Sequence, residues 1–298
     1  MLRITKEGSH GYMSPDIEPK AHCESGDTVL FEAPDCYDGL LKSESDRYSE
    51  ILTVENPVSG PLYINGAEKG DVLKIDILKI EVANQGVQAM KPNGGPLGKY
   101  IDEEYSKIIP IKDGQVMFND KIHIPLLPMI GTIGTAPEHG SVDTMTPGEH
   151  GANMDCKKIQ EGTTLYLPVN TPGALLQIGD VHGVMGDGEV ALDALEVEAE
   201  VTVRVTVCKN LPIPTPMVES EDEYVTIASA QTMDEAAVLA CDKMYHFLGY
   251  MTDINEKDRI ALLSLVGDLG ICQVVDPLMT ARMTVPKWIF ENYDIHEV

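Results

Sequence analysis

The stretch LEVEAEVTVRVTV, residues 195–207, decides the fold class. Every odd position from Leu195 to Val207 is Leu, Val or Ala, whereas the even positions read Glu, Glu, Glu, Thr, Arg and Thr. Alternation with a period of two places the apolar side chains on one face of a β-strand. We therefore predict a long antiparallel strand with one solvated face, on which Glu196, Glu198 and Glu200 lie.

Further strands are expected on both sides of this stretch. The segment DVLKIDILKIEV, residues 71–82, also alternates, but its apolar phase changes between Ile77 and Leu78. Such a change predicts a β-bulge or a strand that moves between sheets. Short strands are predicted at residues 28–33, 50–54, 62–65, 164–169 and 189–193, where glycines and prolines separate apolar runs.

The last third of the chain changes character after the prolines at positions 212, 214 and 216. Thr232 and Glu235 form a capping-box pattern and predict a helix of about four turns. A second helix is expected from Asn255 to Gly267. The predicted fold is mainly β and α+β overall: a β-sandwich body over residues 1–210 and a smaller C-terminal α/β portion over residues 211–298.

Charge and composition exclude several classes of protein. The 298 residues include 22 Lys and Arg against 48 Asp and Glu, which gives a formal charge of −26. This field repels phosphate backbones and anionic membranes, so we expect no nucleic-acid partner and no membrane partner. No secretory or membrane-spanning segment can be read, and the six cysteines are therefore expected to be reduced thiols in a cytoplasmic protein.

Two loops gather polar groups that a hydrophobic core does not need. GDVHGVMGDGEV, residues 179–190, brings Asp180 and His182 two positions apart and places Glu189 at the start of an expected strand. PGEHGANMDC, residues 147–156, contains Asn153 and Asp155. Glycines allow close backbone approach, and carboxylates with imidazole are ligands for a divalent metal. The two loops together predict a metal site.

Simpler interpretations apply to single residues. Asp187, taken alone, is expected to be a solvated turn residue. Cys156 is more often a small buried hydrophobic residue than a nucleophile, although Lys157 and Lys158 follow it. The glutamates of the alternating strand are more simply its solvated face than a cation site.

The same two loops resemble the paired signatures of the acetamidase/formamidase family, which read close to G-D-x-H-A-x-Q-G-D-G-E and G-G-N-M-D. Residues 54–77 and residues 262–277, LLSLVGDLGICQVVDP, resemble two further blocks of that family, and the pair Asp35 and Cys36 falls where the family tends to have D-C. Three positions depart from the signatures: Ala152 replaces Gly, Gly183 replaces Ala, and Met185 stands where Gln is usual. Because Met185 lacks the side-chain amide of that Gln, the departure is expected to affect which substrate binds more than which reaction is catalysed.

The resemblance implies an amidohydrolase that converts short aliphatic amides, such as formamide and acetamide, to ammonia and a carboxylate. It implies a divalent metal held by His182 and by the carboxylates of Asp35, Asp155 and Asp180. Zinc suits this mixture of ligands better than calcium, which suits an all-oxygen set. Glu189 is the expected proton shuttle, and Asn153 or a backbone N–H of residues 186–188 is the expected oxyanion donor.

Two alternatives remain open at this point. One is a β-sandwich that binds a divalent cation or a small ligand without turnover. The other is a nitrilase-like thiol amidase that uses Cys156. A small amide is the expected substrate, and a homodimer or a higher homo-oligomer is expected because partners commonly cover the edge strands of a sandwich.

Overall fold

The alternating stretch does not form one strand. In the computed structural model, which describes residues 1–295, it divides at Glu198 into β16 (Glu196–Val197) and β17 (Ala199–Cys208), which belong to different sheets. β17 is antiparallel to both β4 (Thr28–Ala33) and β6 (Val72–Val82), and its odd positions from Ala199 to Val205 are buried. The predicted antiparallel strand with one solvated face is therefore confirmed for β17, whereas Glu196 lies in the other sheet.

The phase change in β6 marks a β-bulge, as predicted. Val203 of β17 pairs with Ile77, and Thr202 pairs with Lys79, so Leu78 has no partner in this register. Leu78 is 37% exposed, whereas Ile77 is buried. One inserted residue thus lets both halves of β6 direct their apolar side chains into the core.

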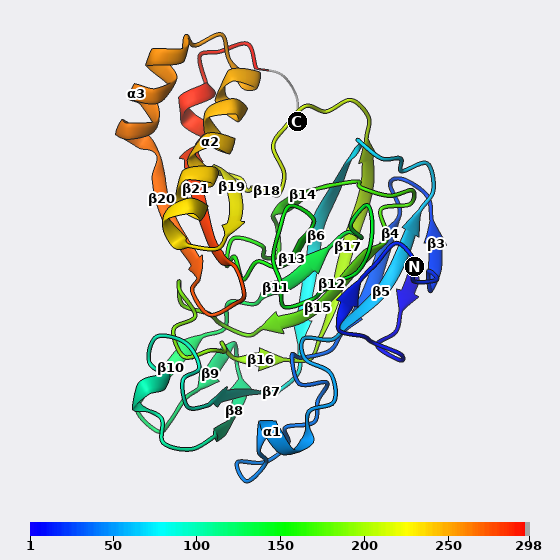
Figure 1. Ribbon diagram of the computed structural model, residues 1–298, viewed down its shortest axis with the longest axis vertical. Coiled ribbons are helices and arrows are strands. Elements are labelled where there is room, and N and C mark those ends of the chain that lie inside the picture. The colour runs from blue at the N-terminus through cyan, green and yellow to red at the C-terminus, as the bar shows by residue number, and fades with distance from the viewer. Residues whose placement is uncertain (296–298) are drawn as a thin grey trace.

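Two large sheets make up most of the molecule (Figure 1). The first has the order β1 (Leu2–Ile4), β4, β17, β6, β14 (Thr164–Pro168), β18 (Met217–Glu219), β19 (Glu223–Ala230), β21 (Met279–Pro286) and β20 (Asp268–Gln273). The second has the order β10 (His123–Pro125), β9 (Gln115–Met117), β8 (Tyr105–Lys112), β7 (Gln85–Met90), β16, β15 (Leu176–His182), β11 (Met129–Gly134) and β13 (Gly151–Asn153), with β5 (Val58–Ile64) on β15 and β3 (Ala21–Cys23) on β5.

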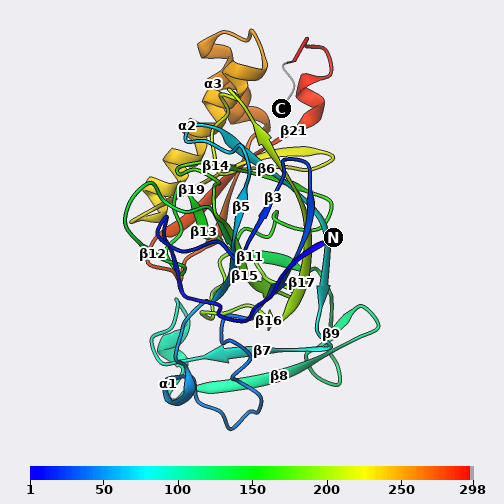
Figure 2. The same ribbon diagram turned by 90° about the vertical axis from the view of Figure 1, so that its right-hand side faces the viewer.

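The remaining elements are short strands and helices. β12 (Val142–Asp143) pairs with β2 (Tyr12–Met13). The helices are α1 (Tyr48–Ile51), α2 (Met233–Met251) and α3 (Glu256–Val266), with 3₁₀ turns η1 (Gly98–Tyr100) and η2 (Lys287–Phe290). Figure 2 shows α2 and α3 at one end of the long axis and β7, β8 and α1 at the other.

The main hydrophobic core lies between the two sheets. It joins side chains of β17 and β6, such as Val203 and Ile75, to side chains of β11 and β15, such as Ile130 and Ile178. All four side chains are fully buried. This packing is that of a β-sandwich, and it gives the second sheet a rigid support for the loops at its edge.

Both C-terminal helices begin where predicted, and α2, with 19 residues, is about one turn longer than the predicted four turns. Thr232 caps α2 with a capping box that includes Glu235, and Asn255 and Gly267 flank α3. However, β18 to β21 continue the first sheet rather than forming one of their own. α2 packs on this extension over a second core that includes Phe247 and Met283. The division at residue 210 remains a prediction.

Two predicted strands are wrong. Residues 50–54 fall on and after α1, a single turn whose Tyr48 and Ile51 pack on a small apolar cluster. Residues 189–193 form a loop, because Glu189 and Leu192 have φ angles of 48° and 90°, which extended strands do not adopt. Apolar composition alone could not distinguish these conformations from strands.

Two findings bear on the expected environment of the protein. Within residues 1–295, no helix has both the length and the apolar character needed to cross a membrane. The six cysteines are free, which agrees with the prediction of reduced thiols.

Candidate active site

Polar side chains from distant parts of the chain converge at the C-terminal end of β15 in the second sheet. Asp180 and His182 are two residues apart on β15, so both project from the same face of that strand. Asp155 follows β13, which joins β15 through β11. Glu189 comes from the loop after β15. The strands of the second sheet thus position residues from both sequence motifs.

His182 lies at the centre of this cluster. Its Nε2 atom is 3.4 Å from an oxygen of Asp180 and 3.7 Å from an oxygen of Asp155. The same nitrogen is 3.9 Å from Glu189 and 3.4 Å from Glu196. One ligand atom each from Asp155, His182 and Glu189 all lie within 4.8 Å of one another. Two loops that are remote in sequence therefore meet at one point.

A second group of possible ligands adjoins the first. Cys36, Asp180 and Glu196 also bring one atom each to within 4.8 Å of one another. Glu196 is the direct antiparallel partner of His182 between β16 and β15. It is only 1% exposed, so its expected place on a solvated strand face is wrong. The cause is the change of sheet at Glu198, which turns Glu196 toward the site.

Gly131 on β11 makes room for the carboxylates. A Cβ atom at this position would lie 2.5 Å from Oδ1 of Asp155 and 2.7 Å from Oδ2 of Asp180. A Cβ atom does not approach an unbonded oxygen that closely in folded proteins. Any side chain at Gly131 would displace these two groups, so the backbone here is part of the site.

Asn153 and Thr132 hold the acids in place. The Asn153 amide nitrogen donates to Asp276 at 3.1 Å, and Thr132 Oγ1 lies 2.5 Å from the Asn153 amide oxygen. The same hydroxyl oxygen is 3.1 Å from Asp180. Asp276 comes from the loop between β20 and β21, so the C-terminal segment also contributes to the site.

Several polar atoms of the cluster lack a partner. Among the residues that the structure describes, both carboxylate oxygens of Asp155 are buried without a hydrogen bond, as are Nδ1 of His182 and single oxygens of Glu196 and Asp276. A buried polar atom without a partner costs about 1–3 kcal/mol, more when it is charged. Carboxylate and imidazole groups in this state fit a divalent cation.

Burial also raises the pKa values of these acids. The pKa of Asp276 rises to about 8, because burial disfavours the carboxylate and the charge of Asp180 adds to this effect. Burial likewise raises the pKa of Asp193 to about 7, although Tyr37 donates a hydrogen bond to it. The pKa of Glu189 lies well above its usual range through burial and the charge of Asp155. Without a cation, Asp276 therefore retains its proton at neutral pH, and Asp193 is protonated in about half of the molecules.

His182 responds to the same surroundings in the opposite way. Burial lowers its pKa, but the charges of Asp180 and Asp155 raise it by more, so that the net direction is upward. The histidine and its acids thus stabilise one another electrostatically, and a cation bound among them would compete with the protons.

A small cavity of about 60 Å³ opens onto the cluster. His182, Glu189 and Asn153 line it, together with Tyr37 and Lys91. One water-sized group needs about 10–15 Å³ in this measure, so the cavity has room for about four or five such groups. A substrate portion of that size fits beside His182.

The expected ligand Asp35 lies outside the cluster, as do Asp187 and Cys156, for which structural roles were the simpler interpretation. Oδ1 of Asp35 accepts the backbone N–H groups of Tyr37 and Gly39, at 3.0 and 2.8 Å, and Asp35 does not line the cavity of His182. Asp187 forms a salt bridge with Arg282 at 2.9 Å. Cys156 is fully buried in the main core. Asp35 and Asp187 thus have structural partners, and Cys156 is covered.

The sequence did not identify three acids of the site. The alternating pattern continues through the change of sheet, so it indicated a solvated position for Glu196. Asp193 lies in the loop predicted as a strand. Asp276 belongs to the segment 262–277 that carries part of the family resemblance, and that resemblance was the one available signal for it.

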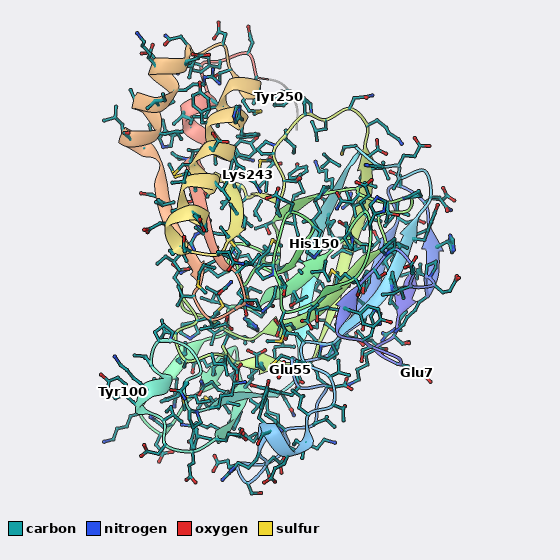
Figure 3. The ribbon with its side chains drawn as sticks, in the orientation of Figure 1. Glu7, Glu55, Tyr100, His150, Lys243 and Tyr250 are labelled. Carbon is teal, nitrogen blue, oxygen red and sulfur yellow. The ribbon has the colours of Figure 1, made fainter. Side chains whose placement is uncertain are left out.

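The loop of residues 147–156 is fixed from the side of α2. Lys243 donates to Glu149 at 2.9 Å and to the backbone oxygens of Thr215 and Ile227 at 2.8 and 2.9 Å. Figure 3 shows Lys243 on α2 next to the body, where His150 lies. Burial lowers the pKa of His150 to about 4, so this histidine is neutral. α2 thus supports the loop that supplies Asp155.

This arrangement can be compared with known proteins. The sequence matches the acetamidase/formamidase family over residues 3–143 and 138–292. The chain belongs to this family. The two ranges include every residue of the cluster, so family membership and the geometry concern the same part of the molecule.

Solved structures of acetamidases share the fold. The chain is 41% identical to an acetamidase from Bacillus halodurans, with a TM-score of 0.96 over 98% of this chain and 100% of that one. It is 31% identical to an acetamidase from Yersinia enterocolitica, with a TM-score of 0.92 over 98% and 93% of the two chains. The acetamidase/formamidase fold thus extends over almost the whole chain.

Curated sequences of the family are more distant. The chain is 25% identical to the acetamidase of Mycolicibacterium smegmatis over 269 residues, 67% of this chain and 66% of that protein. It spans 64–66% of the lengths of the curated acetamidase/formamidase relatives that it matches.

Proposed function

We propose that the protein hydrolyses short aliphatic amides, such as formamide and acetamide, to ammonia and a carboxylate. The observation that carries this proposal is the convergence of Asp155, His182 and Glu189 at a cavity with room for about four or five water-sized groups. Acetamide has four non-hydrogen atoms. Membership of the acetamidase/formamidase family supports the same reaction.

The reaction adds water to the amide carbon and breaks the C–N bond, so one proton must leave the water and one must reach the nitrogen. A divalent metal bound in the cluster would polarise the carbonyl oxygen and lower the pKa of water. We propose His182, Asp155 and Asp180 as residues that hold it. Asp35 is left out of this set because its Oδ1 accepts two backbone N–H groups and its side chain does not line the cavity of His182.

Glu189 is proposed to carry the proton from water to the leaving nitrogen. Burial raises the pKa of Glu189 above its usual range, which is the direction expected of a carboxyl group that must donate a proton as well as accept one. It is also close enough to His182 and Asp155 to act as a ligand instead, so its role requires an experiment. The Asn153 side chain lines the cavity and is proposed to donate a hydrogen bond to the oxyanion.

We propose zinc rather than calcium. Both groups of possible ligands contain a nitrogen or sulfur donor, His182 in one and Cys36 in the other. Zinc accepts such donors at tetrahedral sites, whereas calcium takes oxygen ligands in larger numbers.

Two alternative functions have less support. A thiol amidase would need Cys156 at the cavity, but this residue is fully buried in the main core. A non-catalytic cation site would not need a proton carrier beside the ligands, whereas the proposed carrier Glu189 has a carboxylate oxygen 3.9 Å from Nε2 of His182.

Ammonia release from formamide, acetamide and propionamide tests the proposal. We expect turnover that a chelator abolishes and that iodoacetamide leaves unchanged. Activity that survives removal of the metal but not alkylation would support the thiol alternative. Binding of metal without any ammonia release would support the non-catalytic one.

We also propose that the protein forms a homo-oligomer. β20 is an edge strand of the first sheet, and its Leu269 and Ile271 are 53% and 41% exposed. Apolar residues on an open strand edge favour pairing with another chain. Sedimentation velocity tests this proposal, and a monomer at micromolar concentration would contradict it.

A further inference from the structure

The cavity at His182 is lined by apolar as well as polar side chains. Asp180, His182 and Glu189 bring oxygen and nitrogen atoms to it, whereas Leu192 and Val275 bring aliphatic groups. An amide is divided in the same way, because its carbonyl and amino groups are polar and its acyl chain is not. With the carboxamide at the polar cluster, the acyl chain gains free energy by leaving water for a place against Leu192 and Val275.

Leu192 and Val275 are neighbours in the cavity, and we call them the apolar wall. A Cβ atom at Gly95 would lie 3.0 Å from Cγ1 of Val275 and 3.2 Å from the backbone nitrogen of Leu192. A backbone hydrogen bond of 2.8 Å from Gly188 to Cys272 joins the two segments that carry them. The apolar wall is therefore one surface, although 83 positions separate its two residues.

Glycine backbone lies directly behind the apolar wall. A Cβ atom at Gly94 would lie 3.1 Å from Cδ2 of Leu192, and Gly95 approaches Val275 as closely. Packing at these distances leaves no room for a methylene group between the glycine backbone and the two side chains. An acyl chain that reaches the apolar wall therefore cannot continue through it.

The backbone conformation of Leu192 is a second indication that its side chain has a function. Its φ angle is 90°, which residues other than glycine rarely adopt. The N–H group of Leu192 donates to the carbonyl oxygen of Glu189 at 3.1 Å, so one turn fixes both residues. Unfavourable conformations of this kind persist where the surrounding structure holds them, and they are common at binding sites.

The volume of the cavity limits the length of the acyl chain. At about 60 Å³ the cavity has room for about four or five water-sized groups. Acetamide has four non-hydrogen atoms and propionamide has five, so both fit between His182 and the apolar wall. Butanamide has six and exceeds this space.

We propose that Leu192 and Val275 receive the acyl group of the substrate and restrict it to about three carbons. This inference rests on the proposed amide hydrolysis and assigns the residues that determine its substrate range. The turn of residues 189–192 then has two tasks, because it presents Glu189 to the reacting group and Leu192 to the acyl chain.

The values of kcat/KM for formamide, acetamide, propionamide and butanamide test the chain-length limit. A methylene group that does not fit an apolar pocket lowers kcat/KM by about tenfold or more, so we expect a fall of this size from propionamide to butanamide. Equal values for these two amides would overturn the inference and leave the proposed function intact. If no amide of the series is hydrolysed, both are wrong.

A variant that shortens the apolar wall locates the effect. Leu192→Ala should raise the ratio of kcat/KM for butanamide to that for acetamide by about tenfold or more. This ratio is independent of any loss of turnover that both substrates share. Val190→Ala is the matched control, because Val190 lies in the same loop, is 44% exposed and does not line the cavity. It should leave the ratio unchanged.

Equal ratios in Leu192→Ala and Val190→Ala would contradict the inference. Val275→Ala shortens the other half of the apolar wall and should raise the same ratio. If Leu192→Ala does not fold, Val275→Ala decides, and a ratio equal to that of the unmodified protein would then overturn the inference.

Discussion

Nε2 of His182 lies 3.4 Å from Oε1 of Glu196, its direct partner across the pairing of β15 and β16. The two side chains share one face of the second sheet, and both are 1% exposed. Glu198 and Glu200, which continue the same alternation in the sequence, are instead partly exposed in ion pairs with Lys6 and Arg3. The break between β16 and β17 thus leaves Glu196 in the site and Glu198 and Glu200 at the surface.

This difference gives the first prediction. Glu196→Gln should lower amide turnover by about 100-fold or more, because it removes a charge from the group that surrounds His182. Glu200→Gln, four positions along the alternation, should change turnover by less than about twofold, because that pair with Arg3 is at the surface. Steady-state ammonia release on both variants decides. Similar rates for the two variants would mean that Glu196 has no part in the site.

Asp35 gives the second prediction, which separates a structural from a ligand role. Asp35→Ala should bind as much metal as the unmodified protein, because Oδ1 of Asp35 accepts two backbone N–H groups and the side chain lies outside the cavity of His182. It should be less stable by about 1–3 kcal/mol, because those donors lose a buried partner. Elemental analysis and urea unfolding measure the two effects. Loss of metal with unchanged stability would restore Asp35 to the ligand set.

The third prediction concerns the pH dependence of the stability of the metal-free protein. The pKa of Asp276 is raised to about 8 in the folded protein, so between about pH 4 and pH 8 the folded state holds a proton that the unfolded state has lost. Raising the pH through this range must then favour unfolding. We expect Tm to fall by about 5 °C or more between pH 5 and pH 8.

Asp276→Asn is the control for this effect. It removes the titrating group, so the fall in Tm between pH 5 and pH 8 should become smaller. Scanning calorimetry on chelated samples measures it. An equal fall in both proteins would show that Asp276 does not set the pH dependence.

Glu189 gives the fourth prediction. Glu189→Gln keeps the size of the side chain and removes its ability to carry a proton. If Glu189 is the proton carrier, bound metal should persist while turnover falls by about 100-fold or more. A loss of metal together with activity would show instead that Glu189 is a ligand, and full activity would remove it from the mechanism.

Much of the fold could be predicted from local patterns. The bulge at Leu78 and the caps at Thr232 and Asn255 depend on neighbouring residues alone, so the sequence contains what is needed to identify them. The change of sheet at Glu198 depends on which strands pair, and no local pattern records it. The loop at residues 189–193 was predicted as a strand because its positive φ angles cannot be recognised from its amino-acid composition.

The candidate site was predicted only for those residues that local sequence patterns mark. Asp180 and His182 share a strand, and their spacing of two indicates a shared face. Asp155 and Glu189 stood out because glycine-rich motifs surround them. Asp276 reaches the site only through the extension of the first sheet by β20 and β21, which is a long-range property of the fold.

Zinc titration of the chelated protein, with bound metal and ammonia release measured on the same samples, tests the central claim most directly. The account predicts that the metal-free protein releases no ammonia from acetamide and that the rate rises in proportion to bound metal up to a plateau. A metal-free protein that hydrolyses acetamide at the same rate as the loaded one would contradict it.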